Sequence, residues 1–224
     1  MKNLRNLRVG RWAAIVIDTD SAVGRNFGSV APDEAIPGAI RRRMGRLERL
    51  AVRCTLGVLD KPGDTDELVF CSRHGNVETL TSLLRSIVAR EPMSPMAFSG
   101  SVHNATPGLV GQICKERLSH TAIAAGRQTF AAGLIEAYAR LVTEECKDVT
   151  LTFADVRLPE PFHAFEDESV PGVAIALRLT LGSDETGAMA VASGRGGVLE
   201  LLNRLSDGTT LVAVDTEQWF GAAS

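Results

Sequence analysis

The amino-acid sequence predicts an α/β domain with a mixed, mostly parallel sheet and helices on its faces. Two alternating patterns support this. Short continuous apolar runs, such as residues 12–17, suit strands that are buried on both faces. Between such runs lie segments such as residues 40–59, in which apolar side chains recur every three or four positions, the period of an amphipathic helix. Strands that alternate with helices in this way are typical of a layered α/β domain.

The expected elements follow one another along the whole chain. Asn76 and Asn104 precede two of the helices, where an Asn side chain can cap free backbone N–H groups. The composition of residues 91–103 and of residues 194–197 predicts loops. Helices are predicted at residues 40–59, 77–88, 105–118, 129–144 and 198–205. Strands are predicted at residues 12–17, 68–71, 120–125, 149–156, 172–181 and 211–214.

Length and composition limit the classes of function. A chain of 224 residues with 45% hydrophobic content can bury a substantial core, and we take residues 1–224 as a single domain. A net charge of -3 argues against nucleic acid as a partner, because phosphate-driven binding needs a concentrated basic face. No apolar run approaches the ~20 residues of a membrane helix. We therefore expect no membrane partner and a cytoplasmic location.

Cysteine and histidine spacing predicts neither a metal site nor a cofactor. The four cysteines form no Cys-x-x-Cys pair, so neither a zinc site nor a disulfide framework is indicated. The four histidines, likewise, are scattered without the spacing of a metal-binding motif. These residues are Cys54, Cys71, Cys114 and Cys146, with His74, His103, His120 and His163.

The charge is uneven along the chain. Residues 1–53 hold eleven Lys and Arg against five Asp and Glu, a balance of +6 that leaves -9 for the remainder. Part of the excess lies on the helix predicted at residues 40–59. Such a face could receive an acidic protein or a phosphorylated carrier, although it is more typical of an ordinary solvated helix. Its arginines are Arg41, Arg42, Arg43, Arg46 and Arg49.

A thiol and an imidazole lie three residues apart in the segment Cys71-Ser-Arg-His-Gly75. A nucleophilic cysteine needs a base within hydrogen-bond reach and a lowered pKa, and the spacing alone shows neither. The simpler interpretation is that Cys71 fills the core at a strand end while Gly75 permits a tight turn. A stand-alone acyltransferase or thioesterase that uses Cys71 or Cys114 is therefore kept as an alternative function.

A second candidate site is the turn between the strand at residues 120–125 and the helix that starts near Thr129. Small residues on both sides of a polar pair are typical of a nucleophile elbow, which presents one side chain at a helix N-terminus. Here the polar pair is Arg127 and Gln128. Neither can act as an acyl nucleophile, because a guanidinium stays protonated and an amide nitrogen is not basic.

Several ordered motifs between about residue 10 and residue 182 resemble the ketosynthase family. Residues 94–108 are similar to the ketosynthase loop that leads into an Asn and a small-residue helix, and residues 124–138 resemble its active-site elbow, which ends in Glu-Ala-Tyr. Arg42-Arg43-Met44 resembles an Arg-rich helix start of that family. Pro161-Phe162, with Asp167, Val170 and Gly172, resembles the stretch that precedes a buried strand in ketosynthases. Counting back from Tyr138 places Arg127 where ketosynthases have the catalytic Cys, and a shift of one residue places Gln128 there.

The resemblance implies a thiolase-like fold and a silent role. The chain is similar to the N-terminal half of a ketosynthase; the two catalytic histidines and the lysine of that family lie in the other half, and residues 183–224 are a less certain C-terminal extension. Chain length factors, the inactive partners of ketosynthases in type II polyketide and aryl polyene synthesis, often carry Gln at the nucleophile position. The implied function is a non-catalytic subunit that shapes the acyl tunnel at a heterodimer interface.

The implied partners are a full-length ketosynthase and an acyl carrier protein. An acyl-carrier-protein binding module is also kept as an alternative, compatible function. The carrier is expected to dock on Arg41, Arg42, Arg43 and Arg46. The tunnel and interface are expected to use Met93, Met96, Phe98, Ser101, Val102, Asn104, Ala105, Thr129 and Phe130.

Overall fold

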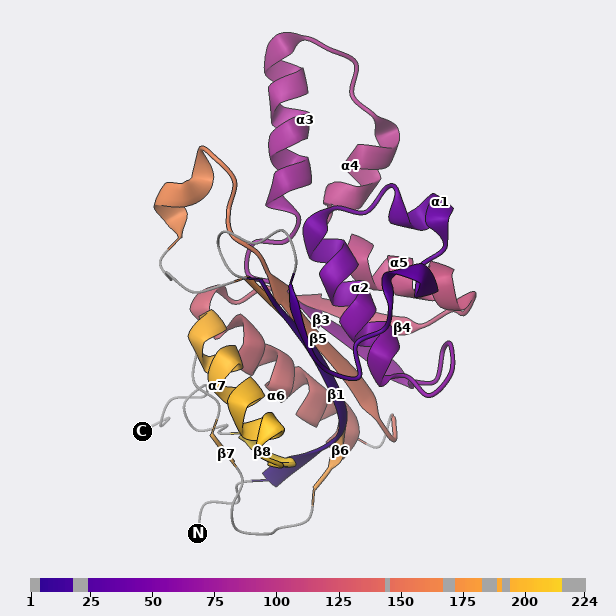
Figure 1. Cartoon of the computed structure of the whole chain (residues 1–224), viewed down its shortest axis with the longest axis vertical. Helices are drawn as coiled ribbons and strands as arrows, with labels where there is room; N and C mark the ends of the chain where they lie inside the picture. Colours follow the sequence, from indigo (N-terminus) through magenta and orange to yellow (C-terminus); the bar gives the residue numbers. More distant parts are fainter. Residues whose placement is uncertain are drawn as a thin grey trace.

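One mixed sheet runs through the molecule between two layers of helices (Figure 1). The computed structural model describes residues 5–17, 24–143, 146–166, 172–182, 189–190 and 194–214. Across the described strands the sheet order is β4-β3-β5-β6-β1-β8-β7, and β2 pairs with β1. The strands are β1 (Arg5–Ile17), β2 (Arg25–Gly28), β3 (Glu67–Cys71), β4 (Ser119–Ile123), β5 (Val149–Asp155), β6 (Gly172–Leu181), β7 (Met189–Ala190) and β8 (Leu211–Val214).

Strand direction divides the sheet into two parts. The strand β3 is parallel to β4 and to β5, and β7 is parallel to β8. The central strands β6 and β1 are antiparallel to each other and to their other neighbours. The α/β class and the mixed sheet are confirmed. Parallel pairing is less extensive than predicted, because the long strands β1 and β6 pair antiparallel from Leu7–Leu181 to Ile17–Gly172, with a register shift between Val9 and Arg11.

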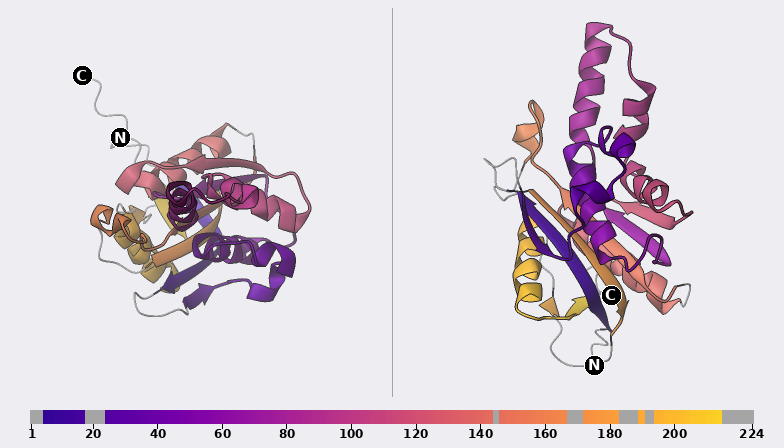
Figure 2. Two further views of the ribbon diagram at one scale, coloured as in Figure 1. Left: turned by 90° about the horizontal axis from the view of Figure 1, so that it is seen from above. Right: turned by 45° about the vertical axis from the view of Figure 1, so that its right-hand side comes forward.

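Each face of the sheet is covered by helices (Figure 2). Successive side chains of a strand point to opposite faces. In β1, Ala13 and Ile15 pack towards α2 (Arg46–Val58). Ala14 and Val16 point to the other face and pack in the core that includes α6 (Thr129–Val142) and α7 (Gly194–Ser206). A third cluster joins α2 to α5 (Ala105–Cys114). The order of layers is therefore α2 and α5, sheet, then α6 and α7.

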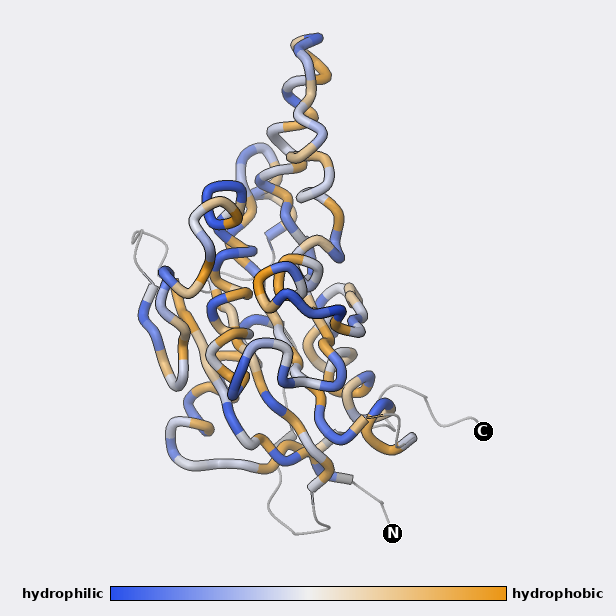
Figure 3. The backbone as a smooth tube through the Cα atoms, turned by 90° about the vertical axis from the view of Figure 1, so that its right-hand side faces the viewer, coloured by the Kyte–Doolittle hydropathy of each residue, from blue (hydrophilic) through white to orange (hydrophobic). Residues whose placement is uncertain are grey.

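Two helices project from the end of the sheet as an arm, α3 (Val77–Ala89) followed by α4 (Pro95–Ser101) (Figures 1 and 2). In α3 only Thr81 and Leu83 are buried. Apolar residues recur along the arm, as the orange segments at the top of Figure 3 show. The arm exposes Leu80, Leu84, Ile87, Val88, Met93, Met96 and Phe98, with Val102 just after it.

The predicted elements are largely confirmed, with local corrections. The helix predicted at residues 40–59 is broken at Gly45 into α1 (Gly38–Arg41) and α2. Residues 91–103 are not all loop, because Ser94 accepts a hydrogen bond from the Ala97 N–H and so caps α4. Residues 194–197 form the first turn of α7.

The two predicted helix caps have different outcomes. The Asn76 side chain accepts a hydrogen bond from the Thr79 N–H, as predicted. Asn104 stands at the N-cap of α5, but its side chain makes no capping bond, and α5 ends at Cys114. Short elements that the sequence did not predict are β2, β7, η1 (Asp33–Ala35), η2 (Gly126–Gln128) and η3 (Phe162–Phe165).

Parts of three predictions lie outside the described residues. Asp167 and Val170 of the family-like stretch are among them, as is the predicted helix end at Glu144. Of residues 183–224, the structure describes β7, α7 and β8. Val198, Leu201 and Leu202 of α7 are buried in the main core, so this part of the extension is packed on the sheet. No helix in the described ranges is long and apolar enough to cross a membrane.

Candidate functional site

The predicted elbow is present: β4 leads through η2 directly into α6. Gly126 makes the bend with a φ of 58°, a left-handed conformation that glycine adopts without strain. The Thr129 hydroxyl donates to the Gly126 carbonyl at 2.7 Å and accepts from the Ala125 N–H at 2.9 Å. The Thr129 side chain thus holds the turn, and the turn places Arg127 and Gln128 on an exposed surface.

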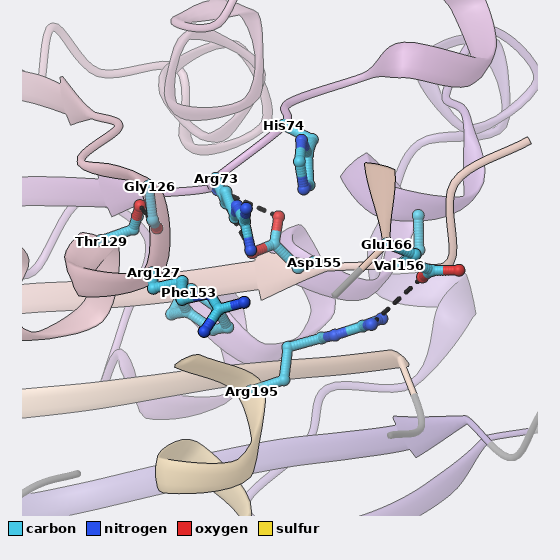
Figure 4. Close-up of a pocket in the computed structure, with 10 residues that line it drawn as sticks. All are labelled: Arg73, His74, Gly126, Arg127, Thr129, Phe153, Asp155, Val156, Glu166 and Arg195. Atoms are coloured by element: carbon cyan, nitrogen blue, oxygen red, sulfur yellow. Dashed lines mark hydrogen bonds and ion pairs between the residues drawn. The ribbon is translucent and has the colours of Figure 1, made fainter. Parts of the chain in front are cut away.

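A small cavity lies beside the elbow, where the C-terminal ends of β3 and β5 meet the start of α6 and of α7 (Figure 4). Its free space is about 20 Å³, room for about one water molecule. The cavity itself is therefore too small to hold an acyl group. The lining residues are Arg73, His74, Gly126, Arg127, Thr129, Phe153, Asp155, Val156, Glu166 and Arg195.

Asp155 organises one wall of the cavity from the end of β5. Its carboxylate accepts hydrogen bonds from the Ser72 hydroxyl at 2.9 Å and from the Arg73 N–H at 3.0 Å. The Ser72 hydroxyl oxygen also accepts from the Gly75 N–H at 2.9 Å. Burial raises the pKa of Asp155 to about 6, and these hydrogen bonds only partly offset it. The carboxylate is therefore a brace for the turn after β3.

The opposite wall is formed by fixed ion pairs. The Arg195 guanidinium donates to Glu166 at 3.1 Å, and both side chains are largely buried. Arg157 pairs with the other oxygen of Glu166 at 3.5 Å. With Arg73 and Arg127 also in the lining, the cavity is rich in cations and has no thiol or nucleophilic serine among its lining residues.

The cysteines lie elsewhere and have the wrong environment for nucleophiles. Cys71 is fully buried at the end of β3, and its sulfur faces Gly133 of α6. Burial raises the pKa of the Cys71 thiol, and the nearby Asp155 carboxylate adds to the effect. Burial likewise raises the pKa of Cys114. A reactive cysteine requires the opposite shift, so the acyltransferase alternative gains no support.

Arg127 and Gln128 differ in their relation to the cavity. Arg127 is one of its lining residues, and Figure 4 shows it beside Phe153, whereas Gln128 is not in the lining. Thr129 lines the same cavity and Phe130 is buried, with its ring edge-on to Phe153 at 5.5 Å. The structure thus brings Arg127, and not Gln128, into the cavity.

The other predicted interface residues gather at the arm. Met93, Met96, Phe98 and Val102 are exposed, while Ser101 is half-buried. Asn104 and Ala105 follow at the start of α5, exposed and half-buried respectively. The predicted tunnel and interface residues therefore fall into two groups. One group lies on or next to the arm, and the other, Thr129 and Phe130, is buried at the start of α6.

The predicted docking arginines lie around the start of α2. Arg41 pairs with Asp33 at 3.2 Å, and the Arg43 guanidinium donates to the Ala39 carbonyl at 2.9 Å. Arg42 and Arg46 are exposed. Among the described residues, no three His, Cys, Asp or Glu side chains are grouped so that they could hold a metal ion.

Sequence patterns did not predict most of the residues that line the cavity. Arg73 and His74 lie in the segment of residues 71–75, where the sequence pattern pointed to the thiol and not to a lining role for these two residues. Asp155 and Arg195 were not singled out. A usable signal was present for Asp155, because an acidic residue at the end of an apolar strand points to the sheet edge where ligand sites form. Arg195 lay in a predicted loop, and only packing brings it to the elbow.

Comparisons with known proteins agree with this fold. The family described as "Beta-ketoacyl synthase, N-terminal domain" matches residues 21–207. Among curated proteins, none matches this chain. In the solved structure of a ketosynthase (ApeO) in complex with its chain length factor (ApeC) from Xenorhabdus doucetiae, a chain is similar with a TM-score of 0.66 and 26% identity, over 80% of each chain.

Two further structures share the fold at lower identity. A beta-ketoacyl synthase from Burkholderia phymatum has a TM-score of 0.60 and 13% identity, over 80% of this chain and 60% of that one. The ishigamide ketosynthase/chain length factor has a TM-score of 0.59 and 16% identity, over 81% of this chain and 63% of that one. Both are similar to this chain along less than two thirds of their own length.

Proposed function

The chain belongs to the beta-ketoacyl synthase family, and from this premise we propose that it is a non-catalytic, chain-length-factor-like subunit that assembles with a full-length ketosynthase. The observation that carries the proposal is the elbow. Its turn presents Arg127 and Gln128, and neither a guanidinium nor a carboxamide can accept an acyl group. The adjoining cavity has room for about one water and none for a thioester.

The comparisons support a subunit of this length. The similarity to a chain of the Xenorhabdus doucetiae complex covers 80% of both chains, so the two are about equally long. The Burkholderia phymatum synthase is covered over only 60% of its length. A short relative thus occurs in a ketosynthase and chain length factor complex, and we extend that assembly to this chain.

The arm and the sheet edge are suited to a partner. The arm exposes large apolar side chains that two helices alone cannot bury, and such patches mark protein interfaces. The strand β4 is at the edge of the sheet, where its outer backbone N–H and C=O groups can pair with another strand. A ketosynthase that covers both would bury the apolar surface and complete the sheet.

In the proposed complex, the arm also limits the acyl tunnel. Met93, Met96, Phe98 and Val102 present bulky or adaptable apolar groups, with Ser101, Asn104 and Ala105 next to them. Side chains of this kind at a subunit interface can set product length by steric exclusion. The product class is a type II polyketide, aryl polyene or fatty-acid-like chain, and Thr129 and Phe130 hold the elbow beside it.

An acyl carrier protein is the second proposed partner. Arg41, Arg42, Arg43 and Arg46 form a positive surface that can attract an acidic protein over the distance set by salt screening. This docking role is compatible with the subunit role, because the arginines lie at α1 and α2 and the exposed apolar residues on the arm. A stand-alone acyltransferase using Cys71 or Cys114 is disfavoured by the buried thiols with raised pKa.

The test is copurification with the ketosynthase encoded beside this gene. Ile87 and Val88 are 54% and 85% exposed on α3. We expect Ile87→Lys with Val88→Lys to weaken the complex at least about tenfold, because two charges would have to be desolvated at the interface. The matched control is Leu181→Lys, a 44% exposed apolar residue at the far end of β6. Failure of the wild-type chain to bind the ketosynthase, or equal loss with the control, would contradict the proposal.

A further inference from the structure

The two ends of the arm are joined at its base. The helix α3 leaves the body after β3, and α4 returns beside it before α5 (Figure 1). The Asn76 side-chain amide donates to the Gly100 carbonyl at 3.3 Å, across 24 positions of the chain. The His103 ring nitrogen Nε2 lies 2.8 Å from the Ser72 carbonyl, across 31 positions. Because a carbonyl oxygen only accepts hydrogen bonds, this nitrogen carries a proton and is the donor.

Ser72 is a fixed point on the body of the protein. It is fully buried, and its backbone N–H donates to the Ile123 carbonyl of β4 at 3.2 Å. Its hydroxyl donates to the Asp155 carboxylate and accepts from the Gly75 N–H, both at 2.9 Å. Leaving one of these buried groups without its partner would cost about 1–3 kcal/mol, which holds the turn in place. The bond from His103 therefore ties the returning chain to the sheet.

A second anchor lies at the start of α2. Glu48 is buried there, and its carboxylate accepts hydrogen bonds from the Gly45 N–H and from the Asn76 side chain. A Cβ atom at Gly45 would be 3.3 Å from the Asn76 amide nitrogen. A Cβ atom at Gly100 would be 3.7 Å from a Glu48 oxygen, so these groups are close together. Burial raises the pKa of Glu48, and the two hydrogen bonds only partly offset this rise.

Asn76 connects three helices with one side chain. Its oxygen accepts from the Thr79 N–H at 3.2 Å and so caps α3. Its amide nitrogen donates to Gly100 of α4, and its side chain also bonds Glu48 of α2. The 13 residues of α3 span about 20 Å at ~1.5 Å per residue. A tilt of about 10° at the base would therefore move the far end of the helix by about 3 Å.

The position of the outer half of the arm depends on this base. The buried side chains of α3 are Thr81 and Leu83, neither of which lies beyond the middle of the helix. Further out, Arg85 donates to the Glu160 carbonyl at 3.1 Å, a bond that is exposed to solvent. Apolar contacts form only when heavy atoms approach within about 4.5 Å. A displacement of about 3 Å would thus remove most contacts between a partner and the apolar side chains at the far end.

We propose that Glu48, Asn76 and His103 form a clasp that sets the direction of the arm and so positions its apolar surface for the partner subunit. Glu48 and Asn76 are buried, so they act through the arm and are positioning residues. The inference rests on the proposed function for the identity of the partner. The effect of the clasp on the arm can be measured without that partner.

The first experiment measures hydrogen exchange of the α3 amides in the full chain and, separately, the affinity of the chain for the proposed ketosynthase partner. Asn76→Asp keeps an oxygen that can cap α3, removes the amide donor and places a second carboxylate against Glu48. We expect exchange in α3 to rise at least about tenfold, and affinity to fall by a similar factor. The control, Asn203→Asp, makes the same change on the exposed side of α7 and should alter neither.

A second substitution distinguishes the clasp from a general loss of stability. Adding Glu48→Gln to Asn76→Asp reverses the donor and the acceptor, because the new amide can donate to the new carboxylate. Its oxygen can still accept from the Gly45 N–H. We expect the pair to restore most of the protection of α3 and most of the affinity. Exchange in β5 should be the same in all of these variants.

His103 tests the other link independently. His103→Ala removes the donor to Ser72, and we expect exchange in α3 to rise at least about threefold. The side-chain amide that His103→Gln introduces can donate to the same carbonyl. Exchange in that variant should therefore stay within about twofold of the wild type.

The outcomes separate the clasp from the proposed function. Unchanged exchange in both Asn76→Asp and His103→Ala, or a rise of equal size in β5, would overturn the clasp. If exchange responds as expected but the wild-type chain binds no ketosynthase, the clasp stands and the subunit assignment fails. If the wild-type chain and Asn76→Asp bind the ketosynthase equally well, the positioning role fails and the subunit assignment stands.

Discussion

Asp155 shows what a single buried carboxylate does in this molecule. It lies at the end of β5 and accepts hydrogen bonds from Ser72 and from the Arg73 backbone, so it fixes the turn that follows β3. Its burial raises the pKa to about 6 from an ordinary value of 3.8. The folded state therefore holds this proton at pH values where the unfolded state has released it, and stability depends on pH.

The sign of this dependence follows from proton counting. Between about pH 4 and pH 6 the folded state binds more protons than the unfolded state, so the contribution of Asp155 is present below pH 4 and is lost as the pH rises through 6. A shift of about two pKa units corresponds to about 3 kcal/mol. In the wild-type chain, we expect the Asp155 contribution to lower the free energy of unfolding by about 1 to 3 kcal/mol between pH 4 and pH 6.5. In Asp155→Asn this decrease should be absent.

Urea unfolding at several pH values measures this slope. Asp207→Asn is the control, because Asp207 is exposed at the end of α7 and should leave the slope unchanged. Identical slopes in the wild-type chain and Asp155→Asn would mean that the carboxylate is not perturbed by burial.

At the scale of the elements, the approach of α6 to the sheet determines where the elbow lies. A Cβ atom at Gly133 would be 2.2 Å from the Cys71 sulfur and 2.9 Å from a methyl group of Leu151. The absence of a side chain lets α6 pack closely against β3 and β5. The helix that begins with Thr129 is thereby held against the strands that supply Asp155 and Arg73.

We expect Gly133→Ala to destabilise the protein by about 1–3 kcal/mol, because overpacking forces the helix or the strand to move. Gly108→Ala is the control in α5, since a Cβ there meets nothing within 4 Å. That substitution should be neutral or stabilising by up to about 1 kcal/mol, through helix propensity. Thermal unfolding of both variants measures the difference, and equal melting temperatures would show that α6 is not closely packed at Gly133.

For the whole molecule, the main feature is the contrast between a well-covered sheet and an uncovered arm. Both faces of the sheet are packed by helices, whereas α3 buries only Thr81 and Leu83. Of the apolar stripe of α3, Leu80, Leu84, Ile87 and Val88 are exposed. A molecule of this shape is stabilised by association, because burial of the arm removes apolar surface from water.

We therefore expect the isolated chain to self-associate at micromolar concentrations and to become uniform when it is coexpressed with the proposed ketosynthase partner. Sedimentation velocity over a concentration series measures this. Ile87→Lys with Val88→Lys should shift the isolated chain towards the monomer, while Leu181→Lys should not. A wild-type chain that stays monomeric at all concentrations would show that the arm is not an association surface.

The prediction of elements succeeded where local patterns decide. The runs at residues 68–71 and 172–177 are strands because their apolar side chains are buried by neighbours on both faces, and the run at residues 211–214 is also a strand. It failed at α4, where Pro95 and the Ser94 cap start a helix in a segment whose composition suggested a loop. The helix stripe of α3 was recognised correctly, but periodicity cannot say whether a stripe faces the core or a missing partner.

The amino-acid sequence alone therefore determined the order of strands and helices, the strand-to-helix elbow and the lack of a nucleophilic side chain at its turn. These depend on residue type and on spacing within a few turns of chain. Tertiary structure decided that Asp155, Glu166 and Arg195 close the elbow cavity and that the arm projects from the sheet. Each of these joins residues distant in sequence, and long-range packing leaves no periodic signal in the chain.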